Sequence, residues 1–285
     1  MLERDGYPAG VPCWIDSGRV KAQPALDFYG GLLGWEFENR APEGADPYYV
    51  ATLGGRDVAA IGQQPWQEHR PVWNTYVWVE DADAAAAKAV KAGGEVQMAP
   101  FDVGAAGRMA VIADPTGASF CVWQPNEHRG AQAVNEPGSW NFSDLHTRDP
   151  ETAMRFYGAM FDWTAGELAE EGYAMIYRPG YGEHLAERDP DLYSRLDGFG
   201  TDRSFADVVA SLAVMSDEQF PPEVPSHWGI TLAVADADAT AARARELGGT
   251  VTVEPFDTEW TRTTIIADPE GCVFTASQFT PPTPD

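Results

Sequence analysis

The segment FYGGLLGW at residues 28–35 recurs as FYGAMFDW at residues 156–163, which lies 128 positions further along the chain. A second and longer pair of segments follows in the same order. VEDADAAAAKAVKAGGEVQMAPFD at 79–102 matches VADADATAARARELGGTVTVEPFD at 234–257, and here the offset is 155 positions. Two matched blocks in one order indicate an internal duplication, which is the feature that decides the fold.

A third pair of segments, IADPTG at 112–117 and IADPEG at 266–271, has an offset of 154 positions. The three pairs together predict a tandem duplication of a unit of roughly 120 residues. Because the offset grows by 27 residues between the first two pairs, the second copy carries an insertion, which we place near residues 180–208. We expect this polar segment to be either a surface loop or a lid over a pocket.

The boundary between the two copies is expected in the polar, proline-flanked stretch PNEHRGAQAVNEP at residues 125–137, which is typical of a linker. We therefore place the first domain at residues 1–128 and the second domain at residues 129–285. A chain of 285 residues is compatible with two domains of about 150 residues each.

The hydrophobic pattern of each copy predicts two consecutive βαβββ modules, and therefore four modules in the chain. In the first copy the expected helices are Gln23–Leu33 and an alanine-rich segment that begins after Asp81 and stops at Gly93. The expected strands are Pro12–Asp16, Trp35–Asn39, Tyr48–Leu53, Asp57–Ile61, Asn74–Val79, Glu95–Ala99, Arg108–Ala113 and Ser119–Gln124.

The charge balance restricts the partners of the protein. The chain has 19 Lys and Arg residues against 44 Asp and Glu residues, which gives a formal net charge of −25. Such an acidic surface repels nucleic acid backbones and anionic lipids, so we expect neither as a partner. The same field would attract a cationic small molecule.

The cysteines and the N-terminus predict a cytoplasmic protein. Cys13, Cys121 and Cys272 are odd in number and widely spaced, so we expect reduced thiols rather than disulfides. The first residues, MLERDGYPAG, lack the apolar stretch of a secretory signal. No apolar run approaches the roughly 18 residues that a transmembrane helix needs.

With FYG and LGW after the first helix and DPxG before the last strand, the chain resembles the vicinal oxygen chelate superfamily of glyoxalases, bleomycin-resistance proteins and extradiol dioxygenases. The resemblance covers almost the whole chain. It looks most like the two-domain actinobacterial members, which include the DnrV-type proteins of anthracycline biosynthesis. The resemblance implies an α+β fold with a tandem pair of domains. In each domain, two βαβββ modules form a curved mixed sheet around a cavity, with the helices outside.

Metal-using members of this superfamily hold the ion with His, Glu or Gln side chains on the first and last strands of the modules. Counted from FYG and DPxG, three of the ligand positions fall on Trp14, Asn74 and Cys121 in the first copy and on Phe142, Gly229 and Thr275 in the second. A divalent ion needs three or four converging oxygen, nitrogen or thiolate donors, which neither set supplies. We therefore expect no metal ion. We also expect no nicotinamide or flavin cofactor, because the chain has no Rossmann fingerprint in the required context.

Alternation along the strands predicts an aromatic wall in the first copy, suited to a planar aromatic ligand. The alternative is that its rings only fill the core. The expected ligand-binding side chains of this wall are Trp14, Asp16, Asn74, Tyr76, Trp78, Cys121 and Trp123.

The second copy is expected to offer a less aromatic set of ligand-binding residues. Asp144 is the counterpart of Asp16, so either carboxylate could bind a ligand or, equally, a neighbouring backbone group or arginine. An Asp144–His146 pair is conceivable because the two residues share a strand face. Of the other histidines, we expect His69, His128 and His184 in solvated loops. The expected ligand-binding residues of the second copy are Phe142, Asp144, His146, Met175 and Trp260.

The function that we expect is metal-free binding or sequestration of a hydrophobic, polycyclic aromatic natural product of the anthracycline type. The resemblance implies a place in antibiotic biosynthesis or self-resistance, where the protein could aid a tailoring oxygenase by relieving product inhibition. The alternative is a cofactor-less isomerase, lyase or oxygenase that acts on an aromatic polyketide, with Asp16, Asp144 or His146 as the base. A third possibility is an interaction protein without a small ligand.

Overall fold

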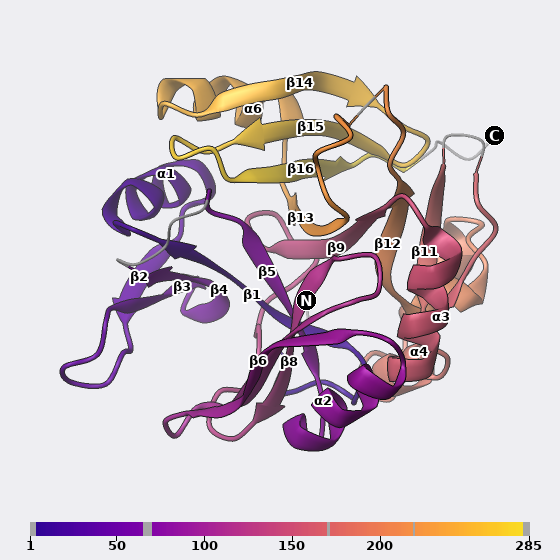
Figure 1. The fold of residues 1–285 in the computed structure, drawn as a ribbon. Coiled ribbons are helices and arrows are strands. Elements are labelled where there is room, and N and C mark those ends of the chain that lie inside the picture. The colour runs from indigo at the N-terminus through magenta and orange to yellow at the C-terminus, as the bar shows by residue number, and fades with distance from the viewer. Residues whose placement is uncertain (1–3, 65–69, 170–171, 219, 282–285) are drawn as a thin grey trace.

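The computed structural model describes residues 4–64, 70–169, 172–218 and 220–281 (Figure 1). Its framework is a pair of eight-stranded sheets, one from each copy of the repeat. The strand orders are β2-β3-β4-β1-β5-β8-β7-β6 and β10-β11-β12-β9-β13-β16-β15-β14. The two orders correspond strand for strand, and each sheet consists of two βαβββ modules, which confirms the fold predicted from the repeat.

The elements of the first copy agree with the sequence pattern, and several strands run up to four residues longer than expected. The helices are α1 (Gln23–Leu33) and α2 (Ala82–Lys91). The strands are β1 (Pro12–Arg19), β2 (Glu36–Asn39), β3 (Tyr48–Leu53), β4 (Arg56–Gln63), β5 (Trp73–Trp78), β6 (Glu95–Val103), β7 (Gly107–Ala113) and β8 (Ser119–Pro125).

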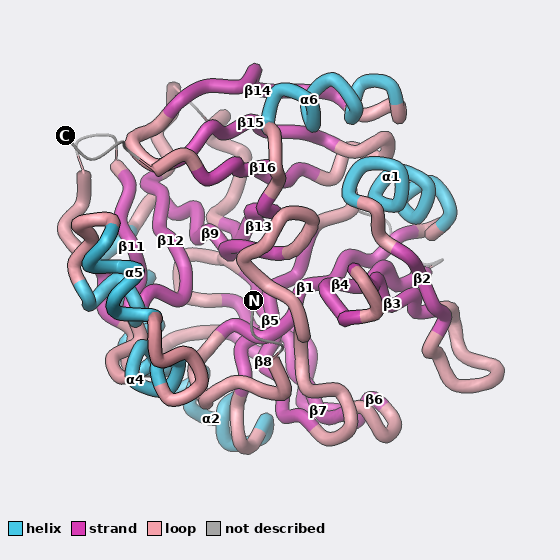
Figure 2. Tube along the Cα trace, turned by 180° about the vertical axis from the view of Figure 1, so that it is seen from behind, coloured by secondary structure: helices cyan, strands magenta, loops and turns pink. Residues whose placement is uncertain are grey.

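The second copy repeats this order and adds three short helical segments. Its counterparts of α1 and α2 are α3 (Pro150–Phe161) and α6 (Ala237–Glu246). The strands are β9 (Trp140–Thr147), β10 (Thr164–Ala165), β11 (Tyr173–Tyr177), β12 (Val208–Val214), β13 (His227–Ala233), β14 (Thr250–Asp257), β15 (Thr261–Ala267) and β16 (Val273–Phe279). The predicted insertion holds α4 (Tyr181–Ala186), α5 (Leu192–Gly198) and the 3-10 helix η1 (Arg203–Asp207), which lie beside β11 and β12 in Figure 2.

The sheets are mixed because the first strand of each module has one parallel and one antiparallel neighbour. In the first sheet, β1 runs parallel to β4 and antiparallel to β5, and β5 runs parallel to β8. The alanine-rich helices begin where the sequence predicts. The Asp81 carboxylate accepts a hydrogen bond from the Ala84 amide at 2.9 Å, and Asp236 does the same for Ala239 at 2.8 Å.

The first helix of each copy packs against the other domain. Helix α1 packs across the boundary beside α6, as Figure 1 shows, and the Phe28 ring lies 6.4 Å from the ring of Phe274 on β16. In the same way, the Phe156 ring of α3 lies 6.1 Å from the ring of Phe120 on β8. The rings approach the partner domain at a glycine: a Cβ at Gly94 would fall 2.6 Å from Phe156 Cε2. The repeated Gly-Gly pairs therefore serve the interface between the domains as well as the helix ends.

The repeated motifs meet each other at this interface. The Tyr29 hydroxyl of the first FYG donates to Asp268 Oδ2 of the second DPxG at 3.1 Å. Between the central strands, Thr75 Oγ1 and Ser143 Oγ lie 2.6 Å apart, with both side chains fully buried. The two domains therefore share one continuous hydrophobic core. Among the helices in the described ranges, none has both the length and the apolar character needed to cross a lipid bilayer.

Candidate functional site

The predicted aromatic wall of the first copy is assembled on one face of the first sheet, around a buried carboxylate. We call the face that carries Trp14, Asp16, Tyr76, Cys121 and Trp123 the first inner face. Asp16 accepts hydrogen bonds from the hydroxyls of Tyr48 at 3.0 Å and Tyr76 at 2.8 Å, and from Asn74 Nδ2 at 2.9 Å.

Burial raises the pKa of Asp16, and these three donors partly oppose the rise. Both carboxylate oxygens of Asp16 already accept hydrogen bonds from side chains of other strands. The residue therefore stabilises the centre of the sheet.

The rings of the first inner face pack against one another. Trp14 is 2% exposed, Tyr76 7% and Trp123 4%. The Trp14 indole donates to the Tyr48 hydroxyl at 3.0 Å, and the Tyr76 and Trp123 rings are 6.2 Å apart. The first inner face is therefore filled by its own side chains, and a ligand would contact these rings only after the face had opened.

One residue of this cluster was placed wrongly by the sequence analysis. His128 does not lie in a solvated loop: it is half-buried, and its ring lies 4.4 Å from that of Trp14 and 5.8 Å from that of Trp123. The linker folds back over the sheet, where the Ala131 amide donates to the Cys13 carbonyl at 2.8 Å. Burial lowers the pKa of His128 to about 4, so the imidazole is neutral at pH 7.

The remaining members of the first set are also buried. Burial raises the pKa of the Cys121 thiol, and the nearby Asp16 carboxylate adds to this effect. Trp78 lies at the edge of the face, 6.2 Å from the Tyr7 ring and 5.6 Å from the Arg129 guanidinium.

The other two histidines that were expected in solvated loops lie elsewhere in the chain. His184 of the insertion is half-buried in helix α4, and its ring stacks on that of Tyr181 with ring centres 6.5 Å apart. His69 lies outside the described residues.

The equivalent face of the second sheet carries smaller side chains. We call the face with Phe142, Asp144, His146, Thr231 and Thr275 the second inner face. Asp144 accepts hydrogen bonds from the hydroxyls of Ser211 and, at 2.7 Å, of Thr231. As in the first copy, burial raises the pKa of this carboxyl group, and the hydroxyl donors oppose the rise.

The Asp144–His146 pair that the strand pattern allowed is not formed. His146 instead stacks on His227 with ring centres 4.8 Å apart, and Phe220 packs at 5.6 Å. Its Nδ1 is buried and has no hydrogen-bond partner among the described residues. Burial, followed by the effect of the His227 charge, lowers the pKa of His146 to about 4. The third-ligand position, Gly229, makes room for this ring, because a Cβ there would lie 3.3 Å from His146 Nε2.

The donor set at the superfamily's ligand positions does not fit a metal ion. The indole of Trp14, the ring of Phe142 and the missing side chain of Gly229 supply no donor atom for a divalent cation. Within the described ranges, no group of three or more His, Cys, Asp or Glu residues is arranged to hold a metal.

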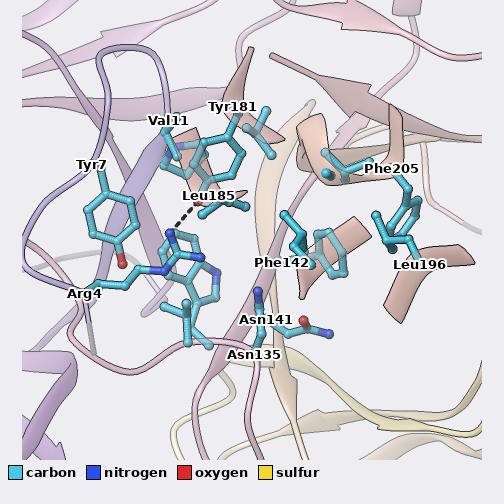
Figure 3. A pocket seen from close by; sticks show the side chains of 17 residues that line it. Arg4, Tyr7, Val11, Asn135, Asn141, Phe142, Tyr181, Leu185, Leu196 and Phe205 are labelled. Carbon is cyan, nitrogen blue, oxygen red and sulfur yellow. Dashed lines mark hydrogen bonds between the residues drawn. The ribbon is translucent and has the colours of Figure 1, made fainter. Parts of the chain in front are cut away.

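A cleft of about 220 Å³ opens between the two domains, beneath the insertion (Figure 3). The N-terminal segment, the linker, the start of β9 and the insertion each contribute to its walls. Figure 3 shows Arg4, Tyr7 and Tyr181 on one side and Leu196 and Phe205 on the other, with Phe142 between them. Phe142 is thus the predicted ligand-binding residue that lines the cleft, and it shares its strand face with Asp144.

Arg4 is the charged side chain among the described residues that line the cleft. Arg4 Nη1 donates to the Tyr181 hydroxyl at 2.7 Å, and its guanidinium lies 5.4 Å from the centre of the Tyr7 ring. The Tyr7 hydroxyl donates to the Ala131 carbonyl at 2.6 Å. Trp140 also lines the cleft, but its buried indole N–H has no acceptor among the described residues.

Most of these cleft residues were missed by the sequence analysis. Arg4, Tyr7, Tyr181 and Phe205 come from segments up to about 200 positions apart, and none belongs to a repeated motif. The one available signal was the insertion itself, which was considered as a lid and which provides one wall of the cleft.

The last two predicted residues lie outside the cleft lining. Met175 is half-buried on β11, opposite Ser211 of β12, and β12 separates it from the strand of Asp144. Trp260 stacks on Phe279 with ring centres 6.5 Å apart, and Phe199 of the insertion meets the same Phe279 ring at 5.6 Å.

Comparison with known families and proteins agrees with this architecture. Residues 19–122 match the model of the Glyoxalase/Bleomycin resistance protein/Dioxygenase superfamily, and residues 142–277 match that of a glyoxalase-like domain. The chain is 36% identical to "Putative glyoxylase CFP32" of Mycobacterium tuberculosis, over 99% of both chains. It is 32% identical to the anthracycline biosynthesis protein DnrV of Streptomyces peucetius, over 96% of this chain and 94% of that protein. The Mn(II)-bound glyoxalase from Novosphingobium aromaticivorans shares the fold, with a TM-score of 0.60 at 14% identity over 95% of this chain and 82% of that one.

Proposed function

The chain belongs to the glyoxalase, bleomycin resistance protein and dioxygenase superfamily, and we propose that it uses this fold to bind a hydrophobic polycyclic aromatic natural product without a metal ion. Bound in this way, the product would be sequestered. In a biosynthetic setting, its removal would relieve product inhibition of a tailoring oxygenase.

The observation that carries the proposal is the cleft beneath the insertion. Aromatic side chains from four separate parts of the chain line it, including Tyr7, Phe142, Tyr181 and Phe205. Concave, mostly apolar sites with a few polar groups are the usual form of small-molecule sites. Relatives named for anthracycline biosynthesis, aligned over nearly the whole chain, support a planar aromatic ligand.

The size of the cleft implies that the insertion moves when a ligand binds. Its volume of about 220 Å³ is below the roughly 300–1,000 Å³ typical of sites for drug-sized ligands. Helix α5 of the insertion has no buried residue, so few apolar contacts oppose its outward movement. We therefore assign the insertion the role of a lid in this proposal.

The cofactor-less enzyme has less support than binding. Burial lowers the pKa of His146, the histidine on β9, to about 4, whereas an efficient general base has a pKa near the working pH. Asp144 already accepts hydrogen bonds from Ser211 and Thr231. These features favour binding without chemical change.

The test is a titration of tryptophan fluorescence with a panel of anthracyclines, with and without a chelator, followed by mass analysis of the recovered ligand. We expect saturable quenching that is insensitive to the chelator, and an unchanged ligand mass. Phe205→Ala should weaken binding about tenfold, because Phe205 lines the cleft. Phe101→Ala, which changes an exposed ring on β6, is the matched control and should have no effect.

The other outcomes are equally informative. A shifted ligand mass would establish the enzyme in place of the binding protein. Absence of saturation with every member of the panel would overturn the proposal, as would equal loss of binding in both phenylalanine variants.

A further inference from the structure

We infer that the cleft recognises its aromatic ligand through an anionic oxygen, a carboxylate or a phenolate, which is held by the Arg4 guanidinium and the Trp140 indole N–H. The inference rests on the proposed function, since it names the chemical class that the cleft would bind.

The first observation is the unpaired charge of Arg4. Most arginines of this acidic protein form ion pairs with carboxylates, whereas Arg4, like Arg129, forms none with any residue in the described ranges. Asp5, which follows Arg4 in the sequence, is paired with Arg188. Arg4 instead lies between two aromatic rings, 5.4 Å from the centre of Tyr7 and 5.8 Å from that of Tyr181. A half-buried cation held by rings retains N–H donors for a further partner.

The second observation is independent of Arg4. Trp140 is 4% exposed and lines the same cleft, and its Nε1–H has no acceptor within hydrogen-bond distance among the described residues. A buried donor without a partner destabilises the protein unless something else satisfies it. An acceptor atom of a bound ligand would do so.

The described lining also offers no carboxylate to pair with a cation. No Asp or Glu is found among the described residues that line the cleft. Asp144, the carboxylate nearest along β9, accepts from Ser211 and Thr231 and is buried. Arg4 and Trp140 can only donate, so an oxygen that accepts two hydrogen bonds complements them.

This local preference opposes the overall field of the molecule. A net charge of −25 attracts cations over distances that salt shortens to about 8 Å at physiological ionic strength. Arg4 acts at contact distance, where screening is weak. Selectivity for the anion should therefore grow as salt is added.

Three tricyclic quinones with the same ring system provide the test: anthraquinone-2-carboxylate, 2-methylanthraquinone and 2-(aminomethyl)anthraquinone. Their affinities for the full-length protein would be measured by calorimetry at two ionic strengths. We expect the carboxylate to bind about tenfold more tightly than the neutral probe, and the amine to bind most weakly at high salt.

Two variants remove the two donors separately. Arg4→Met keeps an apolar stem, and it should remove the tenfold advantage of the carboxylate while leaving the neutral probe within twofold. Arg4→Lys should restore part of the advantage. Trp140→Phe keeps a ring but lacks the N–H, so it should weaken binding of the carboxylate severalfold more than binding of the neutral probe.

The matched control is Arg129→Met, which removes another cation that forms no ion pair in the described ranges and lies over the Trp78 ring, outside the cleft. It should leave the preference for the carboxylate unchanged.

If Arg4→Met weakens all three probes equally, Arg4 only holds the cleft together and the inference is overturned. Equal affinities of the three probes for the wild-type protein overturn it too, while the proposed function stands. Failure of all three probes and of the anthracycline panel would overturn the proposed function itself.

Discussion

On the inner face of the first sheet stand the large side chains of Trp14, Tyr76 and Trp123, whereas the equivalent positions of the second sheet hold Phe142, Thr231 and Ser277. The strand order and register around them are the same. The first copy has used its inner face to build a packed core of rings. The second copy has kept smaller side chains there, and its insertion contributes the wall of a cleft beside them. If the proposed function holds, the two copies of one fold divide the tasks of stability and recognition between them.

The element that did not diverge is the central carboxylate. Asp16 and Asp144 occupy equivalent positions, and each accepts hydrogen bonds from side chains on the adjacent strands. A residue that is retained in both copies, although the surrounding rings have changed, serves the sheet rather than a ligand of one copy. Of the two roles open to these carboxylates in the sequence, the structure favours the bond to neighbouring groups.

The largest expected effect is on stability, and it comes from substituting the equivalent residues Trp14 and Phe142. Trp14→Ala should destabilise the protein by about 3–5 kcal/mol, because it leaves a cavity on a closed face. Phe142→Ala should cost about 1–2 kcal/mol, since its ring is half-buried at the edge of the cleft. Urea unfolding of both variants measures the difference.

Ligand titration of the same two variants should give the opposite ranking. Phe142→Ala should lose most of its affinity for an aromatic probe, whereas Trp14→Ala, studied at low temperature where it is folded, should keep it. Equal effects of both substitutions on both measurements would contradict the division of tasks.

A second comparison concerns the residues that each copy contributes to the interface between the two domains. Tyr29 stacks on Trp35 at 5.4 Å, and Tyr157 stacks on Trp163 at 5.3 Å, so the aromatic parts are alike. The charges differ. Arg19 is fully buried, with Nη2 2.8 Å from Asp268 Oδ2, and its counterpart in the second copy is Thr147. The guanidinium is not aligned for hydrogen bonds, so this contact is an ion pair by proximity alone.

Arg19→Met should therefore destabilise the protein by about 3 kcal/mol, because it leaves the Asp268 carboxylate buried without its cation. Thr147→Val, at the equivalent position, should cost less than about 1 kcal/mol. Thermal unfolding at neutral pH compares the two variants. The double variant Arg19→Met with Asp268→Asn should regain part of the loss. If it is less stable than Arg19→Met alone, the missing cation is not the cause.

The sequence predicts some features of this protein and not others. The hydrophobic pattern predicted every strand of the first copy, since alternation and helical periodicity depend on neighbouring residues. The offsets also revealed the insertion. The burial of His128 could not be predicted from the sequence, because it depends on the linker folding back over Trp14. The cleft was equally hidden, since it joins Arg4, Phe142 and Phe205 only in the folded chain.

The smallest expected effect concerns His128 in the first copy and His146 in the second. Burial lowers the pKa of His128 and His146 to about 4, below the roughly 6.5 of an exposed histidine in the unfolded chain. Folding thus favours the neutral forms. The stability that they contribute is complete above pH 6.5 and is lost as the pH falls toward 4. Between pH 7 and pH 5 each histidine should account for about 1–2 kcal/mol of the lost stability.

His128→Gln and His146→Gln separate the two copies, because glutamine stays neutral throughout this range. The buried carboxyl groups of Asp16 and Asp144 have raised pKa values, so they act in the opposite direction and stabilise the fold as the pH falls. Comparing each variant with the wild type cancels this contribution. The free energy of unfolding should fall less steeply below pH 6.5 in each variant, and least steeply in the double variant. A slope that remains unchanged in His128→Gln would show that the rings of the first inner face admit water to the imidazole, and the packed first face would then be as open as the second.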